Sequence, residues 1–169
     1  DMNEYVDAKR NILAWQDTDG VAVLNHENTI TRGMQKDVMG QLRWFSPLRE
    51  VEDGAYLMED GTLCLAQYGQ PIPVVKQGEL MLRGAHNVEN MLAALAAVRD
   101  EVPLSAMQQV ARTFAGVVHR IEPVRTVKGV QWFNDSIATS PTRVIAGLRA
   151  FDQKLVVIAG GSDKNLPLD

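Results

Sequence analysis

Lys9 has the most unusual setting among the residues that could do chemistry. The segment from Met2 to Gln16 repeats apolar residues at helical spacing, which predicts a helix with Lys9 at the centre of its apolar face, between Tyr5 and Ile12. One interpretation is a lysine whose stem packs while its ammonium reaches water. The other is a lysine available for covalent modification or for charge work in a cleft. The pattern alone favours the first interpretation.

Two amides open a predicted Ala-rich helix. Asn87 and Asn90 lie in the segment His-Asn-Val-Glu-Asn at positions 86–90, and the helix is predicted to run on to Val98. Asn87 could simply cap this helix, although a cap leaves Asn90 without a role. Amides at a helix N-terminus could also hold a nucleotide base or a phosphate.

Arg120 directly follows His119, after a loop and before a predicted strand. Its planar guanidinium could bind a phosphate or a carboxylate through several N–H donors, or it could pair with Glu122 at the surface. The histidines His26, His86 and His119 have no metal-ligand spacing, so the sequence predicts no zinc site.

Polar residues also follow two predicted strands at their carboxyl ends. Asp135, Ser136 and Thr139 lie between a strand and a helix, and could cap the helix or contact a ligand beyond the strand. Residues 160–164, Gly-Gly-Ser-Asp-Lys, follow an apolar strand, and Lys164 could reach an anion. No G-x-x-x-x-G-K-[ST] phosphate loop occurs in the chain. Together these features favour a nucleotide- or anion-binding protein.

The elements that must position these groups alternate between helices and apolar strands, which predicts an α/β fold with a small antiparallel β insert. An Asp60-Gly61 hairpin is predicted inside the insert, and Pro71 and Pro73 confine the next stretch to a sheet edge or a loop. Helices are predicted over 2–16, 87–98, 104–114 and 141–150, with strands over 21–24, 55–58, 62–65, within 124–133 on either side of Lys128-Gly129, and buried over 155–159.

Bulk properties narrow the functional classes. A net charge of -4 without a Lys/Arg cluster argues against a nucleic-acid partner. Cys64 is the only cysteine, so no internal disulfide forms and a reducing, cytoplasmic setting is expected. No apolar run is long enough to insert in a membrane. The chain starts at Asp1 and stops after a predicted parallel strand, which needs a crossover helix to reach its next neighbour. We therefore expect the chain to be cut from a larger protein.

Six segments taken in order resemble the Mur ligases. The HN-x-x-N and His-Arg elements are shared with sister and folate-polyglutamate ligases, whereas the last two segments are similar to the members of the family that add D-glutamate. The six are Tyr-Val-Asp-Ala-Lys at 5–9, Val-Leu-Asn at 23–25, Gly-Ala-His-Asn-Val-Glu-Asn at 84–90, His-Arg at 119–120, Asn-Asp-Ser-Ile-Ala-Thr at 134–139, and Gly-Gly-Ser-Asp-Lys at 160–164.

The resemblance implies a place in a three-domain enzyme. Residues 1–117 would be the later part of a P-loop-type central ATPase domain, with a parallel sheet and the antiparallel insert. Residues 118–169 would begin a Rossmann-like C-terminal domain. The family's phosphate loop and its acidic and histidine Mg²⁺ ligands would lie upstream, so this segment alone is expected to be inactive.

The resemblance also implies roles for single residues. Lys9 matches a carbamylated catalytic lysine whose carbamate helps to bind Mg²⁺. This reverses the earlier preference for a lysine with a solvated ammonium. A carbamate needs a neutral amine, and an apolar surround favours the neutral form of lysine. Asn87 and Asn90 would lie beside the adenine of ATP. Arg120 would reach the nucleotide, and Asp135 its ribose.

The remaining matches surround the second substrate. Ser136, Thr139 and Lys164 would lie around the incoming D-glutamate, with Lys164 paired to its carboxylate as a catalytic-site cation. One departure is Ile137, where the family often has lysine, so an anion contact is absent or supplied elsewhere.

The implied reaction is ATP-driven amide formation in peptidoglycan synthesis, in the cytoplasm and by a monomer. The carboxylate of UDP-N-acetylmuramoyl-L-alanine attacks the γ-phosphate, and the amine of D-glutamate then displaces phosphate from the acyl phosphate, with ATP and Mg²⁺ as cofactors. Two alternatives stay open: a sibling or folylpolyglutamate-type ligase with another amino acid, and a non-catalytic Mur-like binding module. The absence of G-x-G-x-x-G counts against a dehydrogenase-type Rossmann protein.

Overall fold

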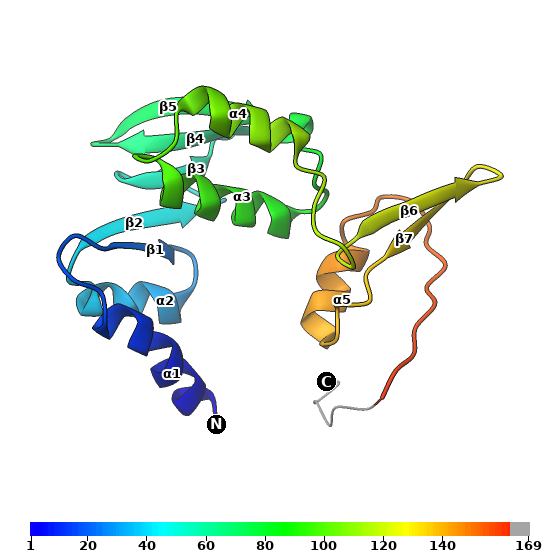
Figure 1. Cartoon of the computed structure of the whole chain (residues 1–169), viewed down its shortest axis with the longest axis horizontal. Coiled ribbons are helices and arrows are strands. Elements are labelled where there is room, and N and C mark those ends of the chain that lie inside the picture. The colour runs from blue at the N-terminus through cyan, green and yellow to red at the C-terminus, as the bar shows by residue number, and fades with distance from the viewer. Residues whose placement is uncertain (163–169) are drawn as a thin grey trace. The chain divides into compact units, whose positions relative to one another are not determined.

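The computed structural model describes residues 1–162 and divides into two compact units (Figure 1). The first unit comprises residues 1–80 and 88–113, and the second comprises residues 81–87 and the chain from 114 onward. No helix among the described residues has the length and apolar character that crossing a bilayer requires.

A five-stranded mixed sheet organises the first unit, in the order β1-β2-β3-β4-β5. The first three strands run parallel and the last two are antiparallel additions, which confirms the predicted parallel sheet with an antiparallel insert. The strands are β1 (Val21–Asn25), β2 (Gln41–Ser46), β3 (Gly54–Leu57), β4 (Thr62–Gln67) and β5 (Gln70–Lys76).

Helices cover both faces of this sheet. Strand residues alternate between faces, so Ala22 and Leu24 pack with Leu13 and Met34 on one side, while Val23 packs toward the other core. The first side carries α1 (Met2–Ala14), α2 (Thr29–Gly33) and the 3₁₀ turn η1 (Met34–Asp37). The other side carries α3 (Ala85–Val98) and α4 (Leu104–Thr113), which lie along the sheet in Figure 1; the turn η2 (Gln77–Glu79) follows β5.

Local turn chemistry in the insert agrees with the sequence. The Asp60-Gly61 turn joins β3 to β4, and Gly61 has the positive φ (78°) that such a turn requires. The β5 strand, which contains Pro71 and Pro73, lies at the edge of the sheet, where a proline without an N–H donor is tolerated.

The α1 helix forms as predicted, with Asp1 and Glu4 in a capping box, but its predicted apolar face is wrong. Only Leu13 is buried, whereas Tyr5 is 61% and Ile12 is 72% exposed. Lys9 is exposed too, with its Nζ 5.4 Å from the centroid of the Tyr5 ring. Of the α1 side chains, Leu13 and Val6 pack in the core beside β1, so the apolar surround expected for Lys9 is not found within residues 1–162.

The second unit contains the hairpin β6 (Glu122–Val127) and β7 (Val130–Asn134), followed by α5 (Pro141–Leu148). Lys128 and Gly129 both have positive φ, 50° and 81°, so the hairpin turn has the left-handed pair that matches strand twist. Pro141 takes the first helical position of α5, where its missing N–H costs nothing.

The buried strand predicted over residues 155–159 is wrong. These residues have no regular structure, and Val156 and Ile158 are 95% and 83% exposed. An apolar run becomes a buried parallel strand only beside a parallel neighbour. Among the described residues of this unit, the only sheet is the antiparallel pair β6–β7, so the run has no such neighbour.

Candidate functional site

A cavity of about 330 Å³ lies within the second unit. Its volume is at the lower end of the range of small-molecule sites. The loop before β6, the end of β7, the start of α3 and one side of α5 contribute to its wall. The lining residues are His86, Arg120, Ile121, Asp135, Ile137, Ala138, Thr142, Arg143, Ala146 and Gly147.

Arg120 is presented by a strained loop. The residues on either side of it, His119 and Ile121, have φ of 66° and 47°, a region that side chains other than glycine rarely adopt and that is costly for a β-branched isoleucine. Hydrogen bonds hold the loop in place: His119 N–H donates to Glu122 Oε2 (2.8 Å) and Ile121 N–H to Asp135 Oδ1 (3.1 Å). Backbone strain that the surroundings maintain in this way is common at ligand sites.

Asp135 is fixed from two sides. Its Oδ1 accepts the Ile121 N–H, and its Oδ2 lies 2.6 Å from the place where a Cβ on Gly147 would stand. Gly147 is buried near the C-terminal end of α5, so the carboxylate occupies space that only a glycine leaves open.

The two arginines that line the cavity have no carboxylate partner among residues 1–162. Arg120 and Arg143 form no ion pair or side-chain hydrogen bond with any other residue in the part of the chain that the structure describes. Among the described residues, Asp135 is the one acidic side chain in the lining. The wall therefore offers two guanidinium groups to an anion and one carboxylate to a hydroxyl or amino group.

The two amides predicted to bind a base lie one turn apart on α3. Asn87 is buried, and its Nδ2 donates to the carbonyl of Arg83 at 2.7 Å, so it ties the start of the helix to the preceding chain. Asn90 is exposed and does not line the cavity, whereas His86, which directly precedes Asn87, does.

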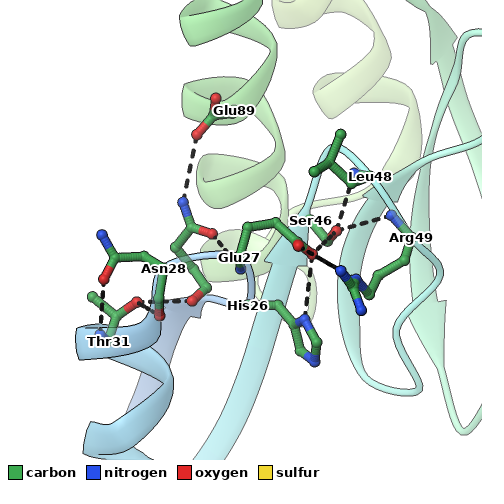
Figure 2. Close-up of polar contacts among 9 residues, drawn as sticks. His26, Glu27, Asn28, Thr31, Ser46, Leu48, Arg49 and Glu89 are labelled. Atoms are coloured by element: carbon green, nitrogen blue, oxygen red, sulfur yellow. Dashed lines mark hydrogen bonds and ion pairs between the residues drawn. The ribbon is translucent and has the colours of Figure 1, made fainter.

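A second polar cluster lies in the first unit, where β1 and β2 end (Figure 2). The Glu27 carboxylate accepts hydrogen bonds from Ser46 Oγ (2.8 Å) and from Nε (2.9 Å) and Nη2 (2.8 Å) of Arg49, and His26 Nδ1 lies 3.3 Å away. Burial alone would raise the pKa of Glu27, but the hydrogen bonds from Ser46, Arg49 and His26 outweigh it and leave the pKa below its ordinary value. Glu27 is therefore ionised at neutral pH, and its hydrogen bonds join the segment after β1 to the segment after β2.

Asn25 connects that cluster to α3. Its Oδ1 accepts the Glu27 N–H at 2.8 Å, and its Nδ2 donates to Glu89 Oε2 at 3.4 Å. Glu89 directly precedes Asn90 on α3, so the end of β1 contacts the helical turn that carries this amide.

Among the residues predicted from the sequence, the structure brings Arg120 and Asp135 together in the cavity. Ser136 and Thr139 are exposed in the loop after Asp135 and are not part of the lining, and Lys9 lies in the first unit. Lys164 lies outside the described residues.

Sequence reasoning missed Ile121, Arg143 and Gly147. Arg143 lies two residues after Pro141, whose helix-start signal was available, and the first turn of a helix after a strand is where a ligand-binding cation is expected. The role of Gly147 had no signal, because it depends on a contact with a residue twelve positions earlier.

A metal site is not formed by the described residues alone. Within residues 1–162 no group of three or more His, Cys, Asp and Glu side chains is arranged to hold an ion. The side chains in this part of the chain therefore do not fit Mg²⁺ without further ligands.

Comparison with known sequences gives matches over the whole chain. A profile of the Mur ligase middle domain matches residues 1–98. The UDP-N-acetylmuramoylalanine--D-glutamate ligase of Clostridium beijerinckii is 51% identical over 99% of this chain and 36% of its own length. The enzyme of the same name from Clostridium kluyveri is 45% identical over 100% of the chain and 36% of its own length. The chain thus spans about a third of these relatives.

Solved structures share the fold. MurF from Acinetobacter baumannii superposes with a TM-score of 0.67 at 18% identity, covering 86% of this chain and 32% of that one. A murein peptide ligase from Psychrobacter arcticus gives a TM-score of 0.63 at 21% identity, covering 87% and 31%.

Proposed function

The chain belongs to the Mur ligase family, and on that premise we propose that it is a segment of an ATP-dependent ligase that adds D-glutamate to UDP-N-acetylmuramoyl-L-alanine in peptidoglycan synthesis. Identity of 45–51% with D-glutamate ligases across the chain supports this choice of amino acid. The enzyme would act in the cytoplasm, where nucleotide-linked precursors are available.

The observation that carries the proposal is the cavity in the second unit. Arg120 and Asp135 were assigned to the nucleotide on separate sequence motifs, and both line this cavity. Arg120 has no carboxylate partner among the described residues and is presented by a strained loop, as suits a group held ready for a phosphate. Asp135, which the Ile121 N–H and Gly147 hold in place, would accept a hydrogen bond from a ribose hydroxyl.

We propose roles for the other site residues from the resemblance, because none of those that the structure describes lines the cavity. Asn87 and Asn90 would flank the adenine from α3. Lys9 would carry a carbamate, and Ser136, Thr139 and Lys164 would surround D-glutamate. ATP supplies the phosphoryl group, and Mg²⁺ would need ligands beyond the described residues, so we derive no step through the metal.

The chemistry these residues support is activation followed by displacement. The substrate carboxylate takes the γ-phosphoryl group of ATP to give an acyl phosphate and ADP. The amine of D-glutamate then attacks the acyl carbon, forms the amide and releases phosphate. The chain's own groups contribute by positioning: guanidinium groups neutralise phosphate charge, and a lysine holds the amino-acid carboxylate.

The test is phosphate release by the complete reading frame that contains this chain. The protein is incubated with ATP, Mg²⁺ and UDP-N-acetylmuramoyl-L-alanine, and D-glutamate, L-glutamate, L-lysine or D-alanyl-D-alanine is added in separate reactions. We expect release with D-glutamate alone. Release with a different amino acid would assign the chain to a sibling ligase, and release with none would favour a binding module.

A further inference from the structure

We propose that Arg143 binds an anionic group of the ligand that occupies the cavity of the second unit, and that it supplies the positive charge that Ile137 does not. The identity of the ligand rests on the function proposed above. Under that function the anion is either a phosphate of the nucleotide or a carboxylate of the amino acid, and both present the same chemistry to a guanidinium group.

The first support is position. Arg143, Ala146 and Gly147 all line the cavity, and they lie three and four residues apart on α5, so they share one face of the helix. Gly147 on that face is in contact with Asp135. Arg143 is therefore one helical turn from the contact that fixes Asp135, on the side of α5 that the cavity uses.

The second support is charge. Arg120 and Arg143 give the lining two positive groups against the single carboxylate of Asp135, and Asp135 forms an ion pair with neither of them in the part of the chain that the structure describes. The unpaired arginines leave the cavity with an excess positive charge that an anion would neutralise.

The third support is the character of position 137. Ile137 lines the same cavity and is 44% exposed, so an apolar side chain takes a wall position where the resemblance implied lysine. Arg143 contributes a cation to that same cavity from the next element of the chain. Arg143 would thereby supply to the cavity the positive charge that the resemblance implied at position 137.

The test uses the complete reading frame with four variants: Arg143→Ala, Arg143→Lys, Ile137→Lys combined with Arg143→Ala, and Arg149→Ala. The last is a matched control, because Arg149 is exposed at the other end of α5 and does not line the cavity. For each protein, kcat and the KM for ATP and for D-glutamate are measured separately. Calorimetric binding of ATP gives a readout that does not depend on turnover.

We expect Arg143→Ala to raise one KM by roughly tenfold to a hundredfold, the value of a lost hydrogen bond to a charged group. A raised KM for ATP, with weaker calorimetric binding, assigns Arg143 to a phosphate. A raised KM for D-glutamate assigns it to the amino-acid carboxylate. Arg143→Lys should raise the same KM by less, because it keeps the positive charge. Ile137→Lys combined with Arg143→Ala should recover much of the affinity that Arg143→Ala loses.

Unchanged KM values and unchanged ATP binding in Arg143→Ala, or an equal effect in Arg149→Ala, would overturn the inference. If Arg143→Ala does not fold, Arg143→Gln keeps the side-chain stem and gives the same comparison. Turnover by the unaltered protein with D-glutamate tests the proposed function separately. That turnover could succeed while the inference about Arg143 fails.

Discussion

The carboxylate of Asp135 lies against the backbone of Gly147 so closely that a Cβ at position 147 would be 2.6 Å from Oδ2. Real Cβ atoms do not approach an oxygen at that distance, so any side chain at position 147 must displace the carboxylate. Asp135 also accepts the N–H of Ile121, which adjoins Arg120. A single glycine in α5 thereby maintains the arrangement of two residues that line the cavity.

We predict that Gly147→Ala raises the KM for ATP about tenfold, because the displaced Asp135 loses its place beside the ribose. The loss should be smaller with dATP if the missing contact is to the 2′-hydroxyl. Steady-state kinetics of the complete reading frame with both nucleotides measures this. Gly33→Ala is the control, since Gly33 is also helical and nothing lies within 4 Å of its Cβ position. Equal effects of the two substitutions would contradict the role given to Gly147.

Glu27 should make stability depend on pH in a defined direction. Its pKa in the folded protein is below the ordinary value, because its hydrogen bonds outweigh its burial. The ionised carboxylate therefore contributes stability above the ordinary carboxyl pKa, and that contribution is lost as pH falls through the folded value. Glu27→Gln should lower the free energy of unfolding by about 1–3 kcal/mol near neutral pH.

Urea unfolding of the unaltered protein and of Glu27→Gln at about pH 7 and about pH 3 measures this difference. The gap between the two proteins should narrow at the lower pH. A gap that stays constant would show that the charge of Glu27 is not the source of its contribution.

The buried arginine of β2 gives a prediction about the core of the first unit. Arg43 is 2% exposed; it donates to the Ala96 carbonyl at 2.9 Å and pairs with Asp100. Asp100→Asn removes the only carboxylate that pairs with this guanidinium among the described residues, and with it one of the two that pair with Arg99. Because Asp100 is 43% exposed and screened by water, we expect a loss of about 1–2 kcal/mol, less than for a fully buried pair.

Asp60→Asn is the matched control for Asp100→Asn. The pair of Asp60 with Lys76 is exposed on both sides, and hydrogen bonds from Lys76 and Thr62 lower the pKa of Asp60 to about 2. Its loss should destabilise the protein less in the same urea measurement. A larger effect at Asp60 would contradict the importance assigned to the buried arginine.

Lys9 should be required for turnover if it carries the proposed carbamate. Lys9→Ala is expected to lower kcat by orders of magnitude, and ¹³CO₂ should give a carbamate carbon signal that this variant lacks. Lys36→Ala is the control, because Lys36 is likewise exposed in the first unit. Full activity of Lys9→Ala would remove this lysine from the site.

Local signals made most of the fold predictable from the sequence. The turns at Asp60-Gly61 and Lys128-Gly129 each contain a glycine with positive φ, and both hairpins form where expected. The strand predicted over 155–159 failed because an apolar run identifies a strand only if a neighbouring strand is available. The predicted apolar face of α1 is exposed for a similar reason: helical periodicity identifies an apolar face but not whether another element packs against it.

The candidate site was predictable only in part. Arg120 and Asp135 stood out by type and by their place before and after strands. The contacts that hold them join residues far apart in the sequence: the Ile121 N–H donates to Asp135, and Asp135 lies against Gly147 of α5. The partners of Glu27, at positions 46 and 49, are likewise brought near only by the parallel pairing of β1 with β2.

The most direct test of the central claim is the mass of the reaction product. The complete reading frame is given ATP, Mg²⁺ and UDP-N-acetylmuramoyl-L-alanine with an equimolar mixture of isotopically labelled D-glutamate, L-lysine and D-alanyl-D-alanine. We predict a single new nucleotide product, heavier than the substrate by one labelled D-glutamate residue. A product carrying either of the other labels, or no product from an enzyme that still binds ATP, would contradict the assignment as a D-glutamate ligase.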